Sequence, residues 1–248
     1  MIRQYGIIGY PLTHSRSPFF FNRYFKENNF TDCTYNSFPI KDISYFLELI
    51  QKNPNLYGLN VTSPYKQEVM QYLDEMDPLA LKIGAVNTLK ITHHNNMIRV
   101  KGYNTDADAF SESLKNTWGK DFSSALVFGT GGASRAACFA LSQLGIPYQT
   151  VSRKATKASH TYEDISAELI KLTPLLINAT PVGMLQQQQQ QLPLPYAALT
   201  KQHYLFDMIY EPKESFFLSE GKKKGATIQN GEQMFIIQAK TNLKIWNF

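Results

Sequence analysis

A glycine-rich turn joins an apolar run to a helix-like run in this chain, and it reads Val127-Phe128-Gly129-Thr130-Gly131-Gly132-Ala133-Ser134-Arg135-Ala136. Glycine at positions 129 and 131 permits a tight turn and lets backbone N–H groups approach a pyrophosphate. The pyrophosphate then lies at the positive end of the dipole of the following helix. The stretch predicts a dinucleotide-binding turn, although a lone G-x-G is a weak signal.

The end of the next predicted strand indicates which dinucleotide binds. About twenty residues after the glycine turn, folds that select NAD place an Asp or Glu that accepts a hydrogen bond from the ribose 2′-hydroxyl. Here the chain reads Val151-Ser152-Arg153-Lys154, with Lys157 close behind and no carboxylate. Cations at this position suit the 2′-phosphate of NADP. The sequence therefore predicts an NADP-dependent enzyme.

Length and composition allow one large or two modest globular domains. The chain has 248 residues, of which 43% are hydrophobic. Its two cysteines, Cys33 and Cys138, are far apart and match no metal-ligand spacing, so we expect reduced thiols and no metal. No apolar run approaches membrane-spanning length, and residues 1–5 begin no signal peptide. We therefore expect a cytoplasmic protein.

The positive charge of the chain does not require a nucleic-acid partner. The net charge is +5, but the basic residues are dispersed, and we expect the one dense run, Lys222-Lys223-Lys224, to be a solvated helix end. There is no recognised nucleic-acid motif and no basic stripe interleaved with aromatic residues. A small anionic cofactor and substrate account equally well for a mild positive field, so we expect no nucleic acid and no membrane as partners.

Alternating apolar and amphipathic runs predict an α/β architecture with mainly parallel sheets. We expect residues 1–105 to form a first domain. Its predicted elements are strands over 6–8, 35–38 and 56–61, helices over 17–25 and 43–50, and a hairpin of 85–91 with 97–103.

Residues 106–231 are expected to form a second, Rossmann-like domain around the glycine turn. Its predicted elements are a helix over about 108–115 and strands over 125–128, 148–151, 175–178 and 204–207. The six glutamines Gln186 to Gln191 read as a low-complexity loop. The amphipathic run 232–248 is long enough to cross back, pack on the first domain and complete it.

Two serines stand where the first predicted strand passes into a helix. Ser15 and Ser17 lie in the segment Gly9-Tyr10-Pro11-Leu12-Thr13-His14-Ser15-Arg16-Ser17-Pro18. Hydroxyls at a helix N-terminus suit a carboxylate ligand. From the residues alone, we favour the alternative that Ser17 merely caps the helix.

Lys66 and Asp106 are the candidate catalytic residues. A partly desolvated lysine beside a nicotinamide can protonate the oxygen that becomes negative as hydride reaches a carbonyl. The alternative is that Lys66 is a solvent-exposed loop lysine. Asp106 could hold Lys66 and the reacting hydroxyl in place, or it could cap the helix that follows.

Through a series of motifs, the chain resembles the shikimate dehydrogenase family along almost its whole length. Besides the serine segment and the glycine turn, the motifs are Asn60-Val61-Thr62-Ser63-Pro64-Tyr65-Lys66, Gly84-Ala85-Val86-Asn87-Thr88, Asn104-Thr105-Asp106, Asn178-Ala179-Thr180-Pro181-Val182-Gly183-Met184, Asp207-Met208-Ile209-Tyr210-Glu211-Pro212 and Gly231-Glu232-Gln233-Met234. Each motif alone is weak evidence, whereas the whole series in the family's order is highly specific. The resemblance favours the catalytic interpretation of Lys66 and Asp106.

The resemblance implies reversible reduction of 3-dehydroshikimate to shikimate with NADPH, a step of chorismate and aromatic amino-acid biosynthesis. It makes Lys66 and Asp106 the catalytic pair. The implied substrate-binding residues are Ser15, Ser17, Asn60, Thr62, Asn87, Tyr210 and Gln238. The implied cofactor-binding residues are Gly129, Thr130, Gly131, Gly132, Ala133, Ser134 and Arg135 at the pyrophosphate, Ser152, Arg153, Lys154 and Lys157 around the 2′-phosphate, and Asn178, Thr180, Met208 and Gly231.

The chain departs from the family pattern at several positions, and two alternatives stay open. Ser152 replaces a common asparagine and Lys157 a frequent arginine, so we expect a softer preference for NADP. Phe21 replaces a common histidine.

One alternative is a quinate/shikimate dehydrogenase. The two serines and the carboxylate-free adenosine site argue mildly against it. The other is a non-catalytic NADP-binding regulator. We expect a monomer or a homodimer.

Overall fold

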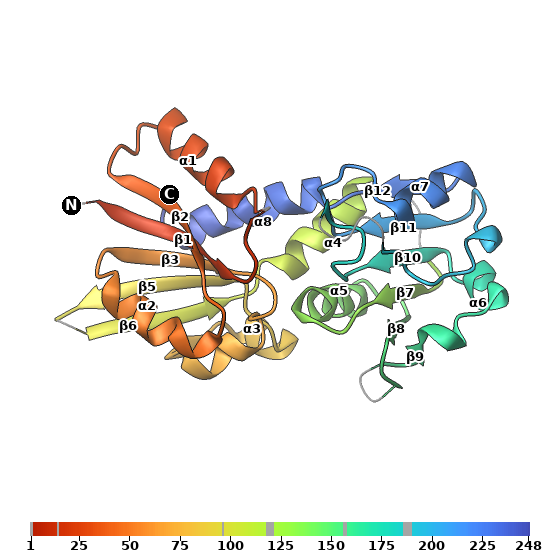
Figure 1. The fold of residues 1–248 in the computed structure, drawn as a ribbon, viewed down its shortest axis with the longest axis horizontal. Helices are drawn as coiled ribbons and strands as arrows, with labels where there is room; N and C mark the ends of the chain where they lie inside the picture. The colour runs from red at the N-terminus through yellow and green to blue at the C-terminus, as the bar shows by residue number, and fades with distance from the viewer. Residues whose placement is uncertain (1, 14, 96, 118–121, 156–157, 186–189) are drawn as a thin grey trace. The chain divides into compact units, whose positions relative to one another are not determined.

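The computed structural model describes residues 2–13, 15–95, 97–117, 122–155, 158–185 and 190–248, and the chain divides into two compact units (Figure 1). Unit 1 comprises residues 1–105 with 239–248, and unit 2 comprises residues 106–238. His14, Lys157 and residues 186–189 of the glutamine run lie outside the described residues. Both units are α/β, which confirms the predicted fold class. The substrate-binding and cofactor-binding roles of the two domains stay predictions.

Unit 1 contains a six-stranded sheet in the order β2-β1-β3-β5-β6-β4. Its strands are β1 (Arg3–Gly9), β2 (Cys33–Pro39), β3 (Leu56–Val61), β4 (Glu75–Met76), β5 (Thr88–His94) and β6 (Met97–Tyr103). β1 pairs in parallel with β2 and β3, and β4 pairs in parallel with β6. β5 is antiparallel to both β3 and β6. Parallel pairs therefore predominate in a mixed sheet.

The helices of unit 1 are short. They are α1 (Ser17–Glu27), α2 (Phe46–Lys52) and α3 (Pro78–Ile83), with 3₁₀ turns at Ile43–Tyr45 and Glu68–Tyr72. The predicted hairpin begins at Thr88 and not at Ala85, because α3 ends at Gly84 with a φ of 69°. A left-handed residue of this kind ends a helix and turns the chain. After Gly84 the backbone N–H of Val86 donates to Lys66 O, so this segment does not extend strand β5.

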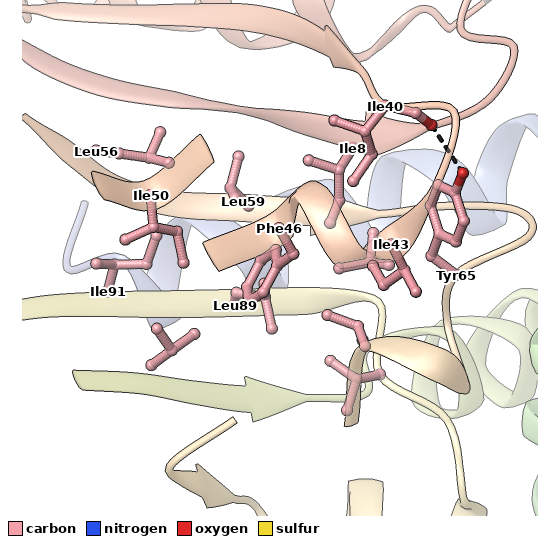
Figure 2. Packing of buried hydrophobic residues seen from close by; sticks show 14 of the residues in the cluster. Ile8, Ile40, Ile43, Phe46, Ile50, Leu56, Leu59, Tyr65, Leu89 and Ile91 are labelled. Atoms are coloured by element: carbon pink, nitrogen blue, oxygen red, sulfur yellow. Dashed lines mark hydrogen bonds between the residues drawn. The ribbon is translucent and has the colours of Figure 1, made fainter. Parts of the chain in front are cut away.

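One face of this sheet packs against α2 and the 3₁₀ turns in an aliphatic core (Figure 2). Ile8, Leu59 and Leu89 come from three neighbouring strands and are fully buried. Phe46 of α2 packs on them, and it is also fully buried. Burial of this apolar surface is the main favourable free-energy term that holds α2 and the 3₁₀ turns against this face of the sheet.

The other face carries an aromatic core, to which the end of α8 (Glu232–Ile245) contributes. Phe21 stacks on Tyr35 with ring centroids 4.5 Å apart, so the aromatic residue at position 21 is a core residue. Trp246 donates from Nε1 to the carbonyl oxygen of Leu89 at 2.9 Å. Its indole lies against Gly58, where any Cβ would collide with it. The end of the C-terminal helix, with the residues that follow it (239–248), therefore packs on unit 1.

Unit 2 contains a wholly parallel six-stranded sheet in the order β12-β11-β10-β7-β8-β9. Its strands are β7 (Ala125–Phe128), β8 (Tyr148–Ser152), β9 (His160–Thr161), β10 (Leu175–Asn178), β11 (Tyr204–Asp207) and β12 (Thr227–Gln229). Counted from β7, this is the Rossmann order 3-2-1-4-5-6. Every residue of β7, β10 and β11 is buried, as a parallel sheet covered on both faces requires.

The helices of unit 2 are α4 (Asp106–Thr117), α5 (Gly132–Gln143), α6 (Ala167–Leu172), α7 (Phe216–Lys223) and the first part of α8. The lysine run ends α7 at the surface, as predicted. Lys222 and Lys223 there form ion pairs with Glu214 and Glu220. Among the described helices, none is both long and apolar enough to cross a bilayer.

We predict that Trp246→Ala lowers the free energy of unfolding by about 3–5 kcal/mol, because it leaves a cavity in the aromatic core and removes a buried donor. Urea unfolding followed by circular dichroism measures the change. Leu81→Ala is the matched control: Leu81 is 58% exposed, so this substitution should cost no more than about 0.5 kcal/mol. Equal costs for the two variants would contradict this account of the core.

Candidate active site

The predicted substrate-binding segments of unit 1 follow two neighbouring parallel strands. Ser15 and Ser17 come after β1, and Thr62 and Lys66 come after β3. Since parallel strands end at the same edge of a sheet, both segments start from one edge. Two backbone bonds tie them: Thr62 N–H donates to Ile8 O at 2.9 Å, and Tyr10 N–H donates to Ser63 O at 3.1 Å.

The two serines have different surroundings. Ser17 is the first residue of α1 and is buried. The N-cap residue is Arg16, which makes no side-chain cap bond. The Ser15 hydroxyl accepts from Ser17 N–H at 3.3 Å. The interpretation of Ser17 as the helix cap is therefore wrong, because the cap position falls one residue earlier.

Lys66 lies on a segment whose backbone is held from two sides. Its carbonyl oxygen accepts from Val86 N–H at 2.7 Å, and the hydroxyl of the preceding Tyr65 donates to Ile40 O at 2.7 Å (Figure 2). Lys66 itself is half-buried. A fully exposed loop lysine, the alternative from sequence, does not describe this residue.

Asn60 is an internal support between strands. Its Oδ1 accepts from the Tyr35 hydroxyl at 2.7 Å. Its Nδ2 donates to Asn87 O at 3.3 Å and to Thr88 Oγ1 at 3.2 Å. Because both ends of this buried amide are bonded to the protein, Asn60 orients its neighbours, which agrees with a supporting role in the substrate shell.

Asn87 is bonded through both ends of its side chain to Thr105, the residue before Asp106. Thr105 N–H donates to Asn87 Oδ1 at 2.8 Å, and Asn87 Nδ2 donates to Thr105 Oγ1 at 2.9 Å. Asn242 of α8 accepts at Oδ1 from Thr105 Oγ1 at 2.9 Å and from Thr88 Oγ1 at 2.7 Å. Sequence reasoning missed Thr88, Thr105 and Asn242. For Asn242 the sequence did carry a signal, because this residue is a polar residue within the apolar run of the last helix.

The remaining predicted residues of the substrate site belong to unit 2. Asp106 is the first residue of α4 and is buried; the dipole of the helix favours a carboxylate there. Tyr210 packs on Phe235 with ring centroids 5.1 Å apart. Gln238 is half-buried in α8. The pairing of Asp106 with Lys66, and the contribution of Tyr210 and Gln238 to substrate binding, stay predictions.

Gly129 and Gly131 of the dinucleotide turn are glycines for two different reasons. Gly129 has a φ of 111°, and a Cβ there would lie 3.0 Å from Ala179 O, so the fold itself needs glycine. Gly131 is the N-cap of α5 with an ordinary φ of −82°, and a Cβ there would meet nothing within 4 Å. The open space beside Gly131 is where a pyrophosphate would approach the helix N-terminus. Ser134 supports the turn by donating to Gly129 O at 2.7 Å.

The predicted adenosine segment is a tight turn after β8. The Ser152 hydroxyl donates to Lys154 O at 2.8 Å and accepts from Lys154 N–H at 3.0 Å. Arg153 and Lys154 are exposed. Ser152 therefore shapes the turn that carries the two cations.

The other predicted cofactor residues follow β10, β11 and β12. Asn178 Oδ1 accepts from Thr180 N–H at 3.0 Å and from Thr180 Oγ1 at 2.7 Å. Met208 N–H donates to Asn178 O at 3.0 Å, and Gly231 lies directly against the Met208 carbonyl, where a Cβ would collide. These residues gather at the carboxyl ends of the strands, which is where ligands bind in open parallel sheets.

Other features of the described residues do not add to this site. A hollow of about 170 Å³ lies on unit 1 over β4, β5 and β6, lined mainly by charged residues that include Glu75, Lys90 and Arg99. Within the described ranges, no three His, Cys, Asp or Glu side chains gather as metal ligands would. Both cysteines are free thiols, and burial raises the pKa of Cys138 to about 11.

The comparisons with known proteins agree on one family. The profile described as the shikimate dehydrogenase substrate binding domain matches residues 7–89. A shikimate dehydrogenase (NADP(+)) from Bacillus cereus is 35% identical, and the match covers 99% of this chain and 93% of the relative.

Solved structures show the same fold. Shikimate 5-dehydrogenase from Thermus thermophilus in complex with NADP(H) and shikimate has a TM-score of 0.85 at 29% identity, covering 99% of this chain and 94% of that one. Quinate dehydrogenase from Corynebacterium glutamicum in complex with NAD also has a TM-score of 0.85 with the same coverage, at 25% identity. The fold alone therefore does not separate the two activities.

We predict that Gly131→Ala weakens binding of NADP⁺ by at least about tenfold, because its methyl group enters the space beside the helix N-terminus. Its cost in stability should stay below about 1 kcal/mol, since no protein atom is displaced. Calorimetric titration with NADP⁺ and thermal unfolding measure the two effects. In the companion variant Gly129→Ala, the main loss should be in stability. Unchanged NADP⁺ affinity in Gly131→Ala would remove this turn from the cofactor site.

Proposed function

The chain belongs to the shikimate dehydrogenase family, and we propose that unit 1 binds the substrate and unit 2 binds NADP(H). The chain is an oxidoreductase that acts on a CH–OH group, and its reaction is the reversible NADPH-dependent reduction of 3-dehydroshikimate to shikimate. One observation carries this conclusion: an NADP⁺-dependent shikimate dehydrogenase matches 99% of the chain. The Rossmann sheet and its glycine turn agree with it.

In the proposed substrate site, Ser15 and Ser17 bind the carboxylate of the substrate. The support is their position at the start of α1, where the helix dipole favours an anion. Thr62, Asn87, Tyr210 and Gln238 are proposed to hold the carboxylate and the ring hydroxyls. The fixed orientation of the Asn87 amide, bonded to Thr105 at both ends, suits this role.

Lys66 and Asp106 are proposed to carry the proton transfer. NADPH supplies the hydride that reduces the C3 carbonyl. The ammonium group of Lys66 donates a hydrogen bond to the carbonyl oxygen, stabilises the negative charge that develops there, and gives up its proton to form the hydroxyl. The Asp106 carboxylate stabilises the charged lysine and orients the reacting hydroxyl. In the reverse direction, neutral Lys66 takes the proton from the hydroxyl of shikimate.

In the proposed cofactor site, residues 129–135 hold the pyrophosphate at the start of α5. Arg153 and Lys154, with Lys157, bind the 2′-phosphate, and Ser152 shapes their turn. The residues after β10, β11 and β12, namely Asn178, Thr180, Met208 and Gly231, line the rest of the site. The absence of a carboxylate from the segment 151–154 supports NADP over NAD.

A quinate/shikimate dehydrogenase is the second candidate, because the fold is equally similar to a quinate dehydrogenase. The higher identity to the NADP⁺-dependent shikimate enzyme favours the first candidate. A non-catalytic regulator has no such support. We further propose a cytoplasmic monomer or homodimer without nucleic-acid or membrane partners.

We predict that Lys66→Ala lowers kcat for oxidation of shikimate by at least about 10²-fold, because general-acid catalysis by a positioned side chain is worth this much. KM for shikimate should change less than about threefold, since the interaction strengthens mainly in the transition state. Steady-state assays at saturating NADP⁺ measure both constants. Lys26→Ala, at an exposed site in the last turn of α1, is the control. An unaltered kcat in Lys66→Ala would remove the residue from the mechanism.

We also predict that replacing Arg153 and Lys154 together by alanine raises KM for NADP⁺ by at least about tenfold, because each charge-assisted bond to the phosphate contributes about 1.5–3 kcal/mol. KM for NAD⁺ should change little, since NAD⁺ carries no 2′-phosphate. The control replaces the exposed Lys171 and Lys201, which keeps the loss of net charge the same. Equal losses with both cofactors would refute the assignment.

A further inference from the structure

A fully buried carboxyl group that the proposed mechanism does not use lies at the end of β11. Asp207 Oδ1 accepts from Asn178 Nδ2 at 3.1 Å and from Ile209 N–H at 3.0 Å. Asp207 Oδ2 accepts from the Ser215 hydroxyl at 2.5 Å. Three bonds from three different segments therefore meet on one side chain.

The bond to Asn178 helps to set the orientation of that amide. Asn178 Nδ2 donates both to Asp207 Oδ1 and to Val182 O, each at 3.1 Å. Its Oδ1 end therefore faces the next loop, where it accepts from the N–H and the hydroxyl of Thr180. The Thr180 hydroxyl in turn accepts from Val182 N–H at 3.2 Å. Asp207 and the Val182 carbonyl together therefore orient Asn178 and, through it, the loop after β10.

The bond to Ile209 N–H closes the turn that carries Met208. Met208 N–H donates to Asn178 O, and Ile209 O accepts from Gly231 N–H at 3.0 Å. Gly231 lies against the Met208 carbonyl. The same carboxyl oxygen therefore fixes the turns after β10 and β11 relative to each other.

The bond from Ser215 links Asp207 to the start of α7. Ser215 is the N-cap of α7, and its hydroxyl accepts from Leu218 N–H at 3.4 Å. Loss of this bond alone would loosen the start of α7 and leave both bonds to Oδ1 in place. The two carboxyl oxygens thus serve separable purposes.

We propose that Asp207 is a positioning residue for the dinucleotide site, whose Oδ1 holds the loops after β10 and β11, and with them Thr180 and Met208, in the arrangement that binds NADP(H). This inference rests on the proposed function of unit 2. Sequence alone placed Asp207 in a motif without a role, because its partners are revealed only by folding.

Burial also changes the protonation equilibrium of Asp207. Burial raises the pKa of Asp207 to about 7, against the opposing hydrogen bonds from Ser215, Ile209 and Asn178. Tyr196 is an ionisable neighbour, and its own pKa is raised by burial and by the charges of Glu220 and Asp207. The folded state therefore binds a proton at Asp207 that the unfolded state releases above its ordinary pKa of 3.8.

The sign of the pH effect follows from this difference. The contribution of protonated Asp207 to the free energy of unfolding is greatest in acid, and it is lost as the pH rises from about 4 to about 7. When the proton lies on Oδ2, this oxygen donates to the Ser215 hydroxyl, so that bond reverses, and Oδ1 stays an acceptor. The bonds to Asn178 and Ile209 can therefore persist in both charge states.

The experiment compares Asp207→Ala, Asp207→Asn and Ser215→Ala in steady-state assays and in calorimetric titration with NADP⁺ between pH 5.5 and 8.5. In Asp207→Ala, KM for NADP⁺ should rise at least about tenfold and KM for shikimate less than about threefold, because Asn178 and Ile209 lose their shared acceptor. Asp207→Asn keeps Oδ1, so it should restore most of the NADP⁺ affinity. Ser215→Ala should lower Tm and leave the affinity for NADP⁺ within about threefold of the wild type.

The dependence of Tm on pH is a separate test of the buried carboxyl group. The wild-type Tm should fall from pH 4 to pH 7 more steeply than the Tm of Asp207→Asn, whose amide does not titrate. An Asp207→Ala variant that is folded and binds NADP⁺ normally would overturn the proposal, and so would equal rises in both KM values. If Asp207→Ala does not fold, weak NADP⁺ binding by folded Asp207→Asn at every pH would overturn it.

Failure of the proposed function is distinguishable from failure of this inference. A wild-type protein that binds NADP⁺ in the calorimeter without oxidising shikimate would refute the activity. The comparison of NADP⁺ affinities among the three variants would still decide the role of Asp207.

Discussion

Parallel pairing of β7 with β8 and β10, and of β10 with β11, is the constraint on which the cofactor site depends. The register aligns Phe128 with Val151 and with Asn178, and Asn178 with Asp207. Since all these strands run in one direction, their carboxyl ends form one edge. The glycine turn, the cationic turn and the two loops held by Asp207 therefore start from neighbouring positions, although up to about eighty residues separate them along the chain.

Buried polar side chains then convert this coarse arrangement into defined loop geometry. In unit 1, Asn87 and Asn242 bind Thr105, and Asn60 joins the adjoining strands. In unit 2, Asp207 performs the same task for the loops after β10 and β11. Buried polar groups that are fully bonded rigidify a site, whereas an unpaired one is costly to bury. Both proposed binding sites thus rest on satisfied hydrogen-bond networks beneath the residues that would touch a ligand.

Local patterns in the sequence were sufficient for much of the fold. The strands 125–128, 175–178 and 204–207 are recognisable as apolar runs and appear in the structure with these bounds. The predicted hairpin began three residues early because the left-handed Gly84 was not recognised as the end of a helix. Ser17 was taken as a helix cap because Ser before Pro is a common start, yet the cap position falls on Arg16.

The supporting residues of the site could not be predicted in the same way. Thr88 and Asn242 are 154 residues apart, and their bond exists only because the last helix packs on unit 1. Asp207 lies in a recognisable motif, but its partners come from the ends of other elements. Periodicity reports which face of an element is buried, and it carries no information on which distant polar group lies opposite. The roles of Lys66, Asp106 and the substrate-binding residues therefore stay predictions.

The most direct test of the central claim is the absorbance of NADPH while the purified protein oxidises shikimate, with quinate and NAD⁺ as parallel alternatives. The account predicts rapid formation of NADPH that depends on both shikimate and NADP⁺, with slower reaction when either is replaced. A preference for quinate or for NAD⁺ would contradict it and assign the protein to the quinate/shikimate enzymes. No reaction in a folded sample that binds NADP⁺ would contradict the enzymatic function itself.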